Sequence, residues 1–344
     1  MFGILRTLLA INVMLLHIFS VPSLGNYSVS FFFILSGFLM TYISHNTYGY
    51  NYKGFKLFWV NRVLRLFPVY WFIFALTILF ILVFPKATST VKAVFIPTSI
   101  LEWLSNITMI FPEIVPHRFS PRVVPTSWAL TNELLFYFLI SLGISKTRFR
   151  TLIWVGLSIG YYIFTYIFYD IPTYRYSAVF ASSLPFSLGA LLFWIIDLYK
   201  PKAYRFSYVI YIYILFIINA IVTFYMSSLV REISIYINMI LAMVLIYCLF
   251  NISSDKKLRN FDKKIGMYSY PIYLSHYLVA FFYITFVNIG VLKNSFKMEL
   301  KALPIYGLML FVFCYLVVVL IDKKVDKLKN VIKKKHKLKS IRIK

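Results

Sequence analysis

Long, uninterrupted runs of apolar residues constrain this chain more than any other feature of its sequence. Ten runs of about twenty residues recur from one end to the other, and a helix of about that length crosses the hydrocarbon core of a bilayer. With 61% hydrophobic and only 14% charged residues among 344, the chain carries too much apolar surface for a water-soluble fold. The runs cover roughly residues 4–22, 27–45, 66–84, 127–145, 151–169, 178–198, 207–225, 233–251, 268–289 and 302–321.

Each run is expected to form an α-helix, because every backbone amide and carbonyl must be hydrogen bonded within the bilayer. Transmembrane β-barrels use alternating segments of about ten residues instead of continuous runs of Leu, Ile, Phe and Val. We therefore predict an all-α fold, a polytopic membrane bundle of about ten transmembrane helices. Residues 1–321 form the membrane domain in this interpretation, and residues 322–344 form a Lys-rich cytoplasmic tail.

The positions of the basic residues predict how the bundle is oriented. With a cytoplasmic N-terminus, 27 of the 36 Lys and Arg residues fall in cytoplasmic segments. Basic residues concentrate on that side of membrane proteins, so both termini are expected in the cytoplasm. The net charge of +25 then belongs to inner loops and a tail beside anionic lipid, and no nucleic-acid partner is expected. Cys248 and Cys314 lie inside apolar runs, so neither a disulfide framework nor a thiolate metal site is expected.

The longest connection between apolar runs spans residues 85–126 and contains six prolines. In the predicted orientation it lies on the outer side of the membrane. A connection of this length is either a functional lid or a poorly ordered loop, and the sequence leaves both alternatives open.

A few ionisable side chains lie inside the apolar runs, where charge is costly and needs an explanation. They are His17, Glu133 and His276. Arg6 and His17 are eleven positions apart, which places them on one face of a helix and about 16 Å apart along its axis. His17 and Glu133 lie at similar depths, about 7–9 Å below the outer boundary. An imidazole and a carboxylate at one depth are candidates for an acid–base pair.

Three arginines near the inner boundary are candidates for binding phosphate. Arg62 and Arg65 share a face if their segment is helical, and Arg6 lies at the inner end of the first run. Guanidinium groups bind phosphate through two parallel hydrogen bonds and keep their charge. Structural roles stay open as alternatives. The arginines can serve only to orient the protein in the membrane. His17 and His276 can be buried core residues, and Glu133 can belong to a structural ion pair.

Five segments, taken in order, resemble the integral-membrane acyltransferase-3 family, the O-acyltransferases that modify bacterial surface glycans and related acceptors. They are Arg6–His17, Phe31–Phe38 with its Ser-Gly-Phe, Arg62–Pro68, Ser127–Tyr137 and, more weakly, Tyr268–His276. The family usually has Gly after the first arginine of this pattern, where this chain has Thr7. That departure concerns helix packing and not chemistry.

The resemblance implies an enzyme that transfers an acyl group, in most cases acetyl, from cytoplasmic acyl-CoA to a hydroxyl of a cell-envelope polysaccharide or glycolipid. It implies a location in the bacterial inner membrane and acyl-CoA as a co-substrate, with no permanently bound cofactor and no metal. No hydrolase-like domain is expected after the last run. Transfer is then completed by the membrane domain or by a separate envelope transferase.

Roles for individual residues follow from the same resemblance. The nucleotide phosphates of the donor would lie on Arg6, Arg62 and Arg65, and its extended arm would pass between helices to His17. His17 would act as a general base or as a transient acyl carrier, with Glu133 orienting it. The residues expected to shape the acceptor site are Ser36, Ser127, Trp128 and His276.

Two other classes of function are alternatives to acyl transfer. A transporter or flippase of a lipid-linked saccharide fits ten spans and basic inner loops, but it predicts polar residues dispersed along a central path. The candidate residues instead concentrate in the first, third and fourth runs. A sensor or scaffold leaves His17 and Glu133 without a role. The sequence therefore favours the acyltransferase.

Overall fold

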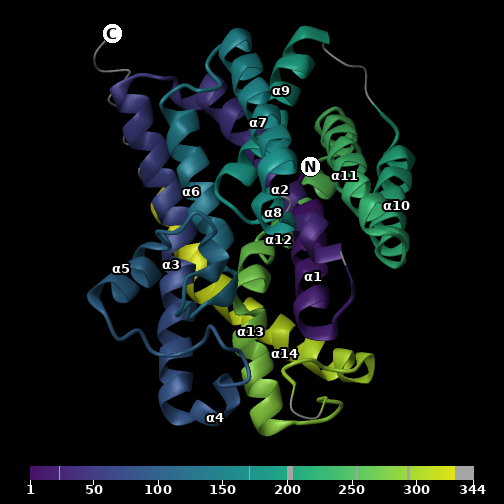
Figure 1. Cartoon of the computed structure of the whole chain (residues 1–344). Coiled ribbons are helices and arrows are strands. Elements are labelled where there is room, and N and C mark those ends of the chain that lie inside the picture. Colours follow the sequence, from purple (N-terminus) through teal and green to yellow (C-terminus); the bar gives the residue numbers. More distant parts are fainter. Residues whose placement is uncertain (23, 170, 200–203, 253–254, 293–294, 330–344) are drawn as a thin grey trace.

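The computed structural model describes residues 1–329 apart from 23, 170, 200–203, 253–254 and 293–294, and these residues form helices and loops without a β-strand (Figure 1). The predicted all-α bundle is confirmed. Its longer helices are α1 (Gly3–Phe19), α2 (Leu24–Ile43), α3 (Tyr52–Val83), α6 (Trp128–Ser141), α7 (Arg148–Phe168), α9 (Ser183–Tyr199), α10 (Phe206–Val222), α11 (Ser228–Phe250), α12 (Lys256–Gly266), α13 (Ser269–Phe286) and α14 (Leu303–Val317).

Each of the ten apolar runs coincides with one of these helices. Within the described ranges, seven helical segments are long and apolar enough to cross a membrane. The number ten and the cytoplasmic location of both termini stay predictions. The described start of the predicted tail continues the last helix as far as Lys329, and residues 330–344 lie outside the described part of the chain.

The helices that carry His17, Glu133 and His276 are α1, α6 and α13, and none of them is among those seven segments. Helices α1 and α6 have only 17 and 14 residues, and α13 contains several polar side chains. Helix α2 packs against both α1 and α6, and α13 packs against α1 and α3. Polar groups in membrane helices face the interior of the bundle, so the candidate site is built on its enclosed helices.

Helix α3 begins well before its apolar run, at Tyr52. The side chain of Asn51 accepts a hydrogen bond from the Gly54 amide at 2.8 Å, which satisfies one of the amides that a helix start leaves unpaired. The segment containing Arg62 and Arg65 is therefore helical. This confirms the condition under which the two arginines share a face.

Helices α2 and α9 pack with their backbones in close contact. A Cβ atom on Gly37 of α2 would lie 2.1 Å from the Phe186 carbonyl oxygen, and one on Gly189 of α9 would lie 2.0 Å from that of Ile34. Small residues allow this backbone contact between membrane helices. The glycine of the Ser-Gly-Phe segment is therefore required for packing, and its neighbour Ser36 is held at a fixed place in the bundle.

We expect Gly189→Ala to destabilise the protein by about 1–3 kcal/mol, the usual cost of overpacking, because backbone atoms of α2 cannot move aside cheaply. The matched control is Gly160→Ala on α7, where a Cβ meets nothing within 4 Å and helix propensity favours alanine. Thermal unfolding of the full chain in detergent micelles measures both. Equal midpoints for Gly189→Ala and wild type would contradict the close contact.

The long connection between α3 and α6 is folded. It contains α4 (Pro85–Thr88) and α5 (Ile100–Thr108), and Asn106 ties its parts together. The Asn106 amide donates to the Pro121 carbonyl at 2.8 Å, and its Oδ1 accepts from the Val123 amide at 2.9 Å. In Figure 1, α4 lies at the bottom of the bundle and α5 lies at its left side. The connection is thus a folded segment and not a poorly ordered loop, and its role as a lid stays a prediction.

Candidate functional site

Two cavities inside the bundle contain most of the predicted site residues. The first, here called the arginine cavity, has a volume of about 90 Å³ and brings together Arg6, Arg62, Arg65, Ser36 and Glu133. These residues come from α1, α2, α3 and α6. The predicted convergence of the three arginines is therefore present in the structure. With three guanidiniums and one carboxylate, this cavity suits an anion.

Arg62 packs against sulfur and aromatic groups and, within the described part of the chain, has one buried N–H without a hydrogen-bond partner. Its Nη1 lies 3.5 Å from the Met40 sulfur, and its guanidinium carbon lies 5.8 Å from the Phe58 ring centre and 5.9 Å from that of Tyr137. Its Nε is buried and has no hydrogen-bond partner among the described residues. Buried donors are rarely left unpaired, so this N–H favours a ligand that accepts hydrogen bonds.

Glu133 belongs to the arginine cavity and not to His17. Its Oε1 accepts a hydrogen bond from the Ser36 hydroxyl at 2.8 Å and another from the Tyr137 hydroxyl. The expected pair of His17 and Glu133 is wrong: helix α2 packs against both α1 and α6, and Ser36 of α2 takes the place of the imidazole as a partner of Glu133. Glu133 instead balances part of the arginine charge.

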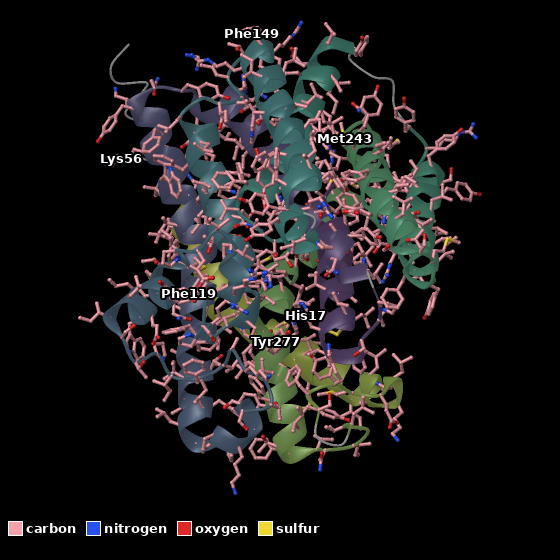
Figure 2. The ribbon with its side chains drawn as sticks, in the orientation of Figure 1. His17, Lys56, Phe119, Phe149, Met243 and Tyr277 are labelled. Atoms are coloured by element: carbon pink, nitrogen blue, oxygen red, sulfur yellow. The ribbon has the colours of Figure 1, made fainter. Side chains whose placement is uncertain are left out.

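The second cavity, here called the histidine cavity, has a volume of about 920 Å³ and is lined by His17 and Trp128 among the predicted residues. Drug-sized ligands occupy pockets of about 300–1,000 Å³, so it can hold a sugar-sized group. Figure 2 shows His17 beside Tyr277, and their ring centres lie 5.3 Å apart. The site therefore offers an imidazole to a large cavity.

His276 is the partner of His17. The Nδ1 atom of His17 lies 2.9 Å from Nε2 of His276, and Nδ1 of His276 lies 3.1 Å from the Ile272 carbonyl oxygen. A carbonyl only accepts, so His276 donates from Nδ1 and its Nε2 is an acceptor in the neutral ring. His17 then donates from Nδ1, and its own Nε2 is left unprotonated. The pair fixes the tautomer that a general base requires.

Lys297 supports the same end of α1 and was missed by sequence reasoning. Its Nζ donates to the carbonyls of Leu16 at 3.1 Å and His17 at 2.6 Å. Cations stabilise the C-terminal end of a helix, where carbonyls lack amide partners. Burial lowers the pKa of Lys297 from its ordinary value. A lone lysine in a loop has no spacing pattern that could have indicated this contact.

The two residues predicted to shape the acceptor entrance have different surroundings. Trp128 lines the histidine cavity, and its ring centre lies 5.9 Å from those of His117 and Tyr176. Ser127 is fully buried, and its hydroxyl donates to the Val124 carbonyl at 2.6 Å. Ser127 lines neither of these two cavities, so its local role is to hold the turn before α6.

Helix α13 contributes lining residues to both cavities, at different heights along its axis. The Ser269 hydroxyl donates to the Arg6 carbonyl at 2.9 Å, Tyr273 lines the arginine cavity, and Tyr277 lines the histidine cavity. Residues four apart on a helix are separated by about 6 Å along its axis. The cavities therefore lie about one helical turn apart.

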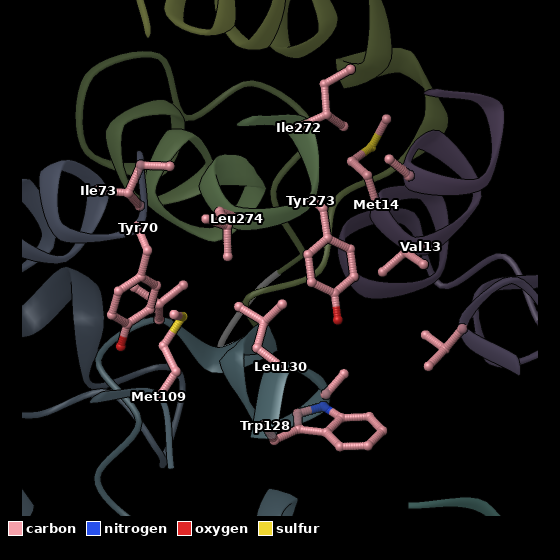
Figure 3. Close-up of a cluster of buried hydrophobic side chains, with 14 of the residues drawn as sticks. Val13, Met14, Tyr70, Ile73, Met109, Trp128, Leu130, Ile272, Tyr273 and Leu274 are labelled. Carbon is pink, nitrogen blue, oxygen red and sulfur yellow. The ribbon is translucent and has the colours of Figure 1, made fainter. Parts of the chain in front are cut away.

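An aromatic partition separates the cavities at this turn. The rings of Phe32 and Tyr273 are 6.1 Å apart, and Figure 3 shows Tyr273 extending from α13 toward Leu130 and Trp128. The Tyr273 hydroxyl donates to the Thr126 carbonyl, and the Thr126 hydroxyl donates to the Tyr273 carbonyl, both at 3.1 Å. The two cavities share no lining residue, so the described residues show no continuous passage of the kind expected from the arginines to His17.

A family model described as an acyltransferase domain matches residues 2–322 of this chain. The Bacillus subtilis (strain 168) protein named "Putative peptidoglycan O-acetyltransferase YrhL" is 30% identical over 157 residues, which is 42% of this chain and 24% of that protein. This chain thus matches only about a quarter of the relative's length. No solved structure matches the chain. Because the family model covers nearly all of a chain built from many apolar helices, this multi-pass membrane protein belongs to the acyltransferase-3 family.

Proposed function

We propose that this protein transfers an acyl group, in the first instance acetyl, from cytoplasmic acyl-CoA to a hydroxyl of a cell-envelope polysaccharide or glycolipid. The observation that supports the proposal is that three arginines line one cavity, while His17, which is hydrogen bonded to His276, lines a neighbouring one. The relative's name specifies peptidoglycan, which supports an envelope glycan as the acceptor. In this proposal the protein is located in the bacterial inner membrane.

The donor's phosphates are assigned to the arginine cavity. Because the cavity is small, at about 90 Å³, we assign only phosphate groups to it and place the rest of CoA outside. Three guanidiniums against one carboxylate favour anions, and charge-assisted bonds from arginine to phosphate are among the strongest hydrogen bonds in proteins. The buried Nε of Arg62 supplies one donor. Ser36 and Tyr137 keep Glu133 in place beside the ligand.

Transfer itself is assigned to His17. Its Nε2 takes the proton of the acceptor hydroxyl while that oxygen attacks the thioester carbonyl. When the C–S bond breaks, the imidazolium returns the proton to the thiolate, which leaves an ester and free CoA thiol. A transient acyl group on the same Nε2 is the covalent version of this route. Either version needs Nε2 unprotonated, as the hydrogen bonds of His17 and His276 support.

The acyl group must pass the aromatic partition to reach His17. Phe32 is partly exposed, and rotation of its ring about the side-chain bonds is a small, fast motion. Tyr273 is held by two hydrogen bonds to Thr126. The proposal therefore assigns the opening to Phe32, with Tyr273 as the fixed side of the passage. A closed partition without acceptor also limits loss of the thioester to water.

Arg65→Ala is expected to raise the apparent KM for acetyl-CoA about tenfold or more, because a hydrogen bond to a charged group is worth that much, while kcat changes less. Lys56→Ala is the matched control: Lys56 is a cation of the same helix that is exposed and does not line the cavity. Initial rates at varied acetyl-CoA with the purified full chain give both constants. An unchanged KM would mean that Arg65 does not bind the donor and only helps to orient the protein in the membrane.

The function as a whole is tested by comparing envelope glycans from cells with and without the gene by NMR. Loss of O-acetyl signals, restored by the intact gene, is the expected result. Accumulation of an unmodified saccharide on one face of the membrane would favour the transporter or flippase. Transfer by the purified chain alone would show that no separate envelope transferase is needed.

A further inference from the structure

The histidine cavity has an excess of positive charge. Four cationic side chains line it, and the acid among its lining residues is Glu232. Glu232 is already paired with a cation, since its Oε1 lies 2.5 Å from Nε of Arg175. Among the described residues of the cavity wall, no acid balances the positive charges of Arg122, Arg231 and Lys297. A neutral ligand would not need this arrangement.

Arg122 is the most enclosed of these cations, with 9% of its surface exposed. Its Nε donates to the Pro125 carbonyl at 3.3 Å and its Nη1 to the Phe119 carbonyl. These partners fix the guanidinium but carry no charge to balance it. Glu113, which interacts with Arg122 electrostatically, is an exposed residue. A cation buried among neutral acceptors is costly, and an anion brought into the cavity would remove that cost.

Arg122 keeps its charge at neutral pH although it is buried. Burial lowers its pKa from the ordinary value to about 10, which is well above physiological pH. His117, on the same connection, has its pKa lowered by burial and by the neighbouring arginines, so it stays neutral and adds no charge. The positive field of this wall of the cavity thus comes from Arg122.

The cations lie close to the proposed base. Arg122 interacts electrostatically with Tyr277, whose ring centre is 5.3 Å from that of His17. From the other side, Lys297 donates to the His17 carbonyl at 2.6 Å. A hydroxyl placed at His17 would therefore lie in a cavity that Arg122 and Lys297 also line. An anionic group on the molecule that carries this hydroxyl would be held within their reach.

We propose that the acceptor is an anionic saccharide, with a carboxylate or phosphate close to the hydroxyl that is acylated, and that Arg122 is the residue that binds this anion. The inference rests on the proposed function, because it names the class of acceptor for the same site. Trp128, Tyr176 and Tyr277 also line the cavity and offer flat apolar faces for the sugar ring. A competing role for Arg122, stabilising the oxyanion of the transfer step, predicts a change in kcat and none in acceptor binding.

Binding of acceptors without donor tests the proposal. Isothermal titration calorimetry of the full chain in detergent micelles uses three probes: a tetrasaccharide of N-acetylglucosamine and N-acetylmuramic acid with free carboxylates, a ribitol phosphate hexamer, and the neutral N-acetylglucosamine tetrasaccharide. We expect at least one anionic probe to bind about tenfold or more tightly than the neutral one. The stronger of the two anionic probes identifies carboxylate or phosphate as the source.

Arg122→Gln is expected to weaken binding of the preferred anionic probe by about 10- to 100-fold and to leave the neutral probe unchanged. Arg122→Lys keeps the charge and should retain part of the preference. The matched control is Arg118→Gln, an exposed arginine of the same connection whose guanidinium carbon lies 5.9 Å from the Tyr174 ring centre and which does not line the cavity. Melting temperatures show whether each variant is folded.

Equal binding of neutral and anionic probes by the wild type would overturn the inference, and so would a folded Arg122→Gln that binds the anionic probe normally. Its failure can be told apart from failure of the proposed function. If the protein transfers acetyl to neutral and anionic glycans equally well, the proposed function stands and the anionic acceptor is ruled out. If an anionic glycan binds through Arg122 but no probe is acetylated, the anion site stands and the proposed function fails.

Discussion

Replacement of His17 by alanine is expected to lower acetyl transfer by about 100- to 10,000-fold, the range that a positioned general base contributes. His17 is the residue of the proposed mechanism whose side chain both lines the histidine cavity and has an unprotonated nitrogen fixed by a neighbour. The loss should appear in kcat, because the arginine cavity proposed to receive the donor is unchanged. Mass spectrometry of the acceptor at matched protein levels measures it.

Two further variants make this result specific. His17→Gln keeps an N–H that can donate to His276 but has no basic nitrogen, so it should be as inactive as the alanine variant. His45→Ala is the control, because His45 contacts the Thr41 carbonyl at 2.9 Å and stacks on Phe193, away from both cavities. Undiminished product from His17→Ala would remove His17 from the chemistry.

The helices could be predicted from the sequence because apolar runs and backbone hydrogen bonding leave few alternatives in a bilayer. Their ends could not. Charged residues interrupt the apolar pattern before residue 66, yet α3 starts at Tyr52 with Asn51 as its cap. The run expected to reach residue 145 ends at Ser141, where Gly143 has a φ of +97°, and glycine in such a conformation commonly terminates a helix.

The arginine cavity could also be predicted in part. Spacing placed Arg62 and Arg65 on one face, and boundary position placed Arg6 at a similar level, so all three converge. The depth of Glu133 relative to His17 was a weaker guide, because depth does not say which helices are neighbours. Ser36 of α2 contacts Glu133 since α2 lies against both α1 and α6. Hydropathy contains no information on that order.

The residues of the histidine cavity are brought together by contacts that the spacing of residues in the sequence does not predict. Arg122 and Lys297 lie in connections between helices, and only the fold brings them to the cavity that His17 lines. His276 was expected as a site-shaping or structural residue, while its hydrogen bond to His17 joins positions 259 residues apart in the chain. Pairing across such a separation is a property of packing, and a single sequence does not reveal it.

Replacement of His276 by leucine is expected to lower kcat by about 100-fold, the upper effect of losing a group that orients a functional imidazole. His276 is fully buried and does not reach either cavity, so we assign it as a positioning residue. Leucine removes the acceptor for Nδ1–H of His17, and the imidazole can then rotate or adopt the other tautomer. The KM for acetyl-CoA should not change.

His276→Gln separates positioning from packing, because its amide oxygen can accept the same hydrogen bond at a similar side-chain size. We expect it to retain activity within about tenfold of wild type, with a kcat/KM pH profile close to the wild-type shape, whereas the leucine variant should show a displaced profile. Loss of a buried polar partner also costs about 1–3 kcal/mol of stability, so unfolding midpoints are measured alongside. Equal losses in both variants would mean that His276 only fills space, and a fully active leucine variant would mean that His17 does not depend on it. The conservative variant matters most here, because rescue by glutamine is a result that a purely structural role for His276 does not produce.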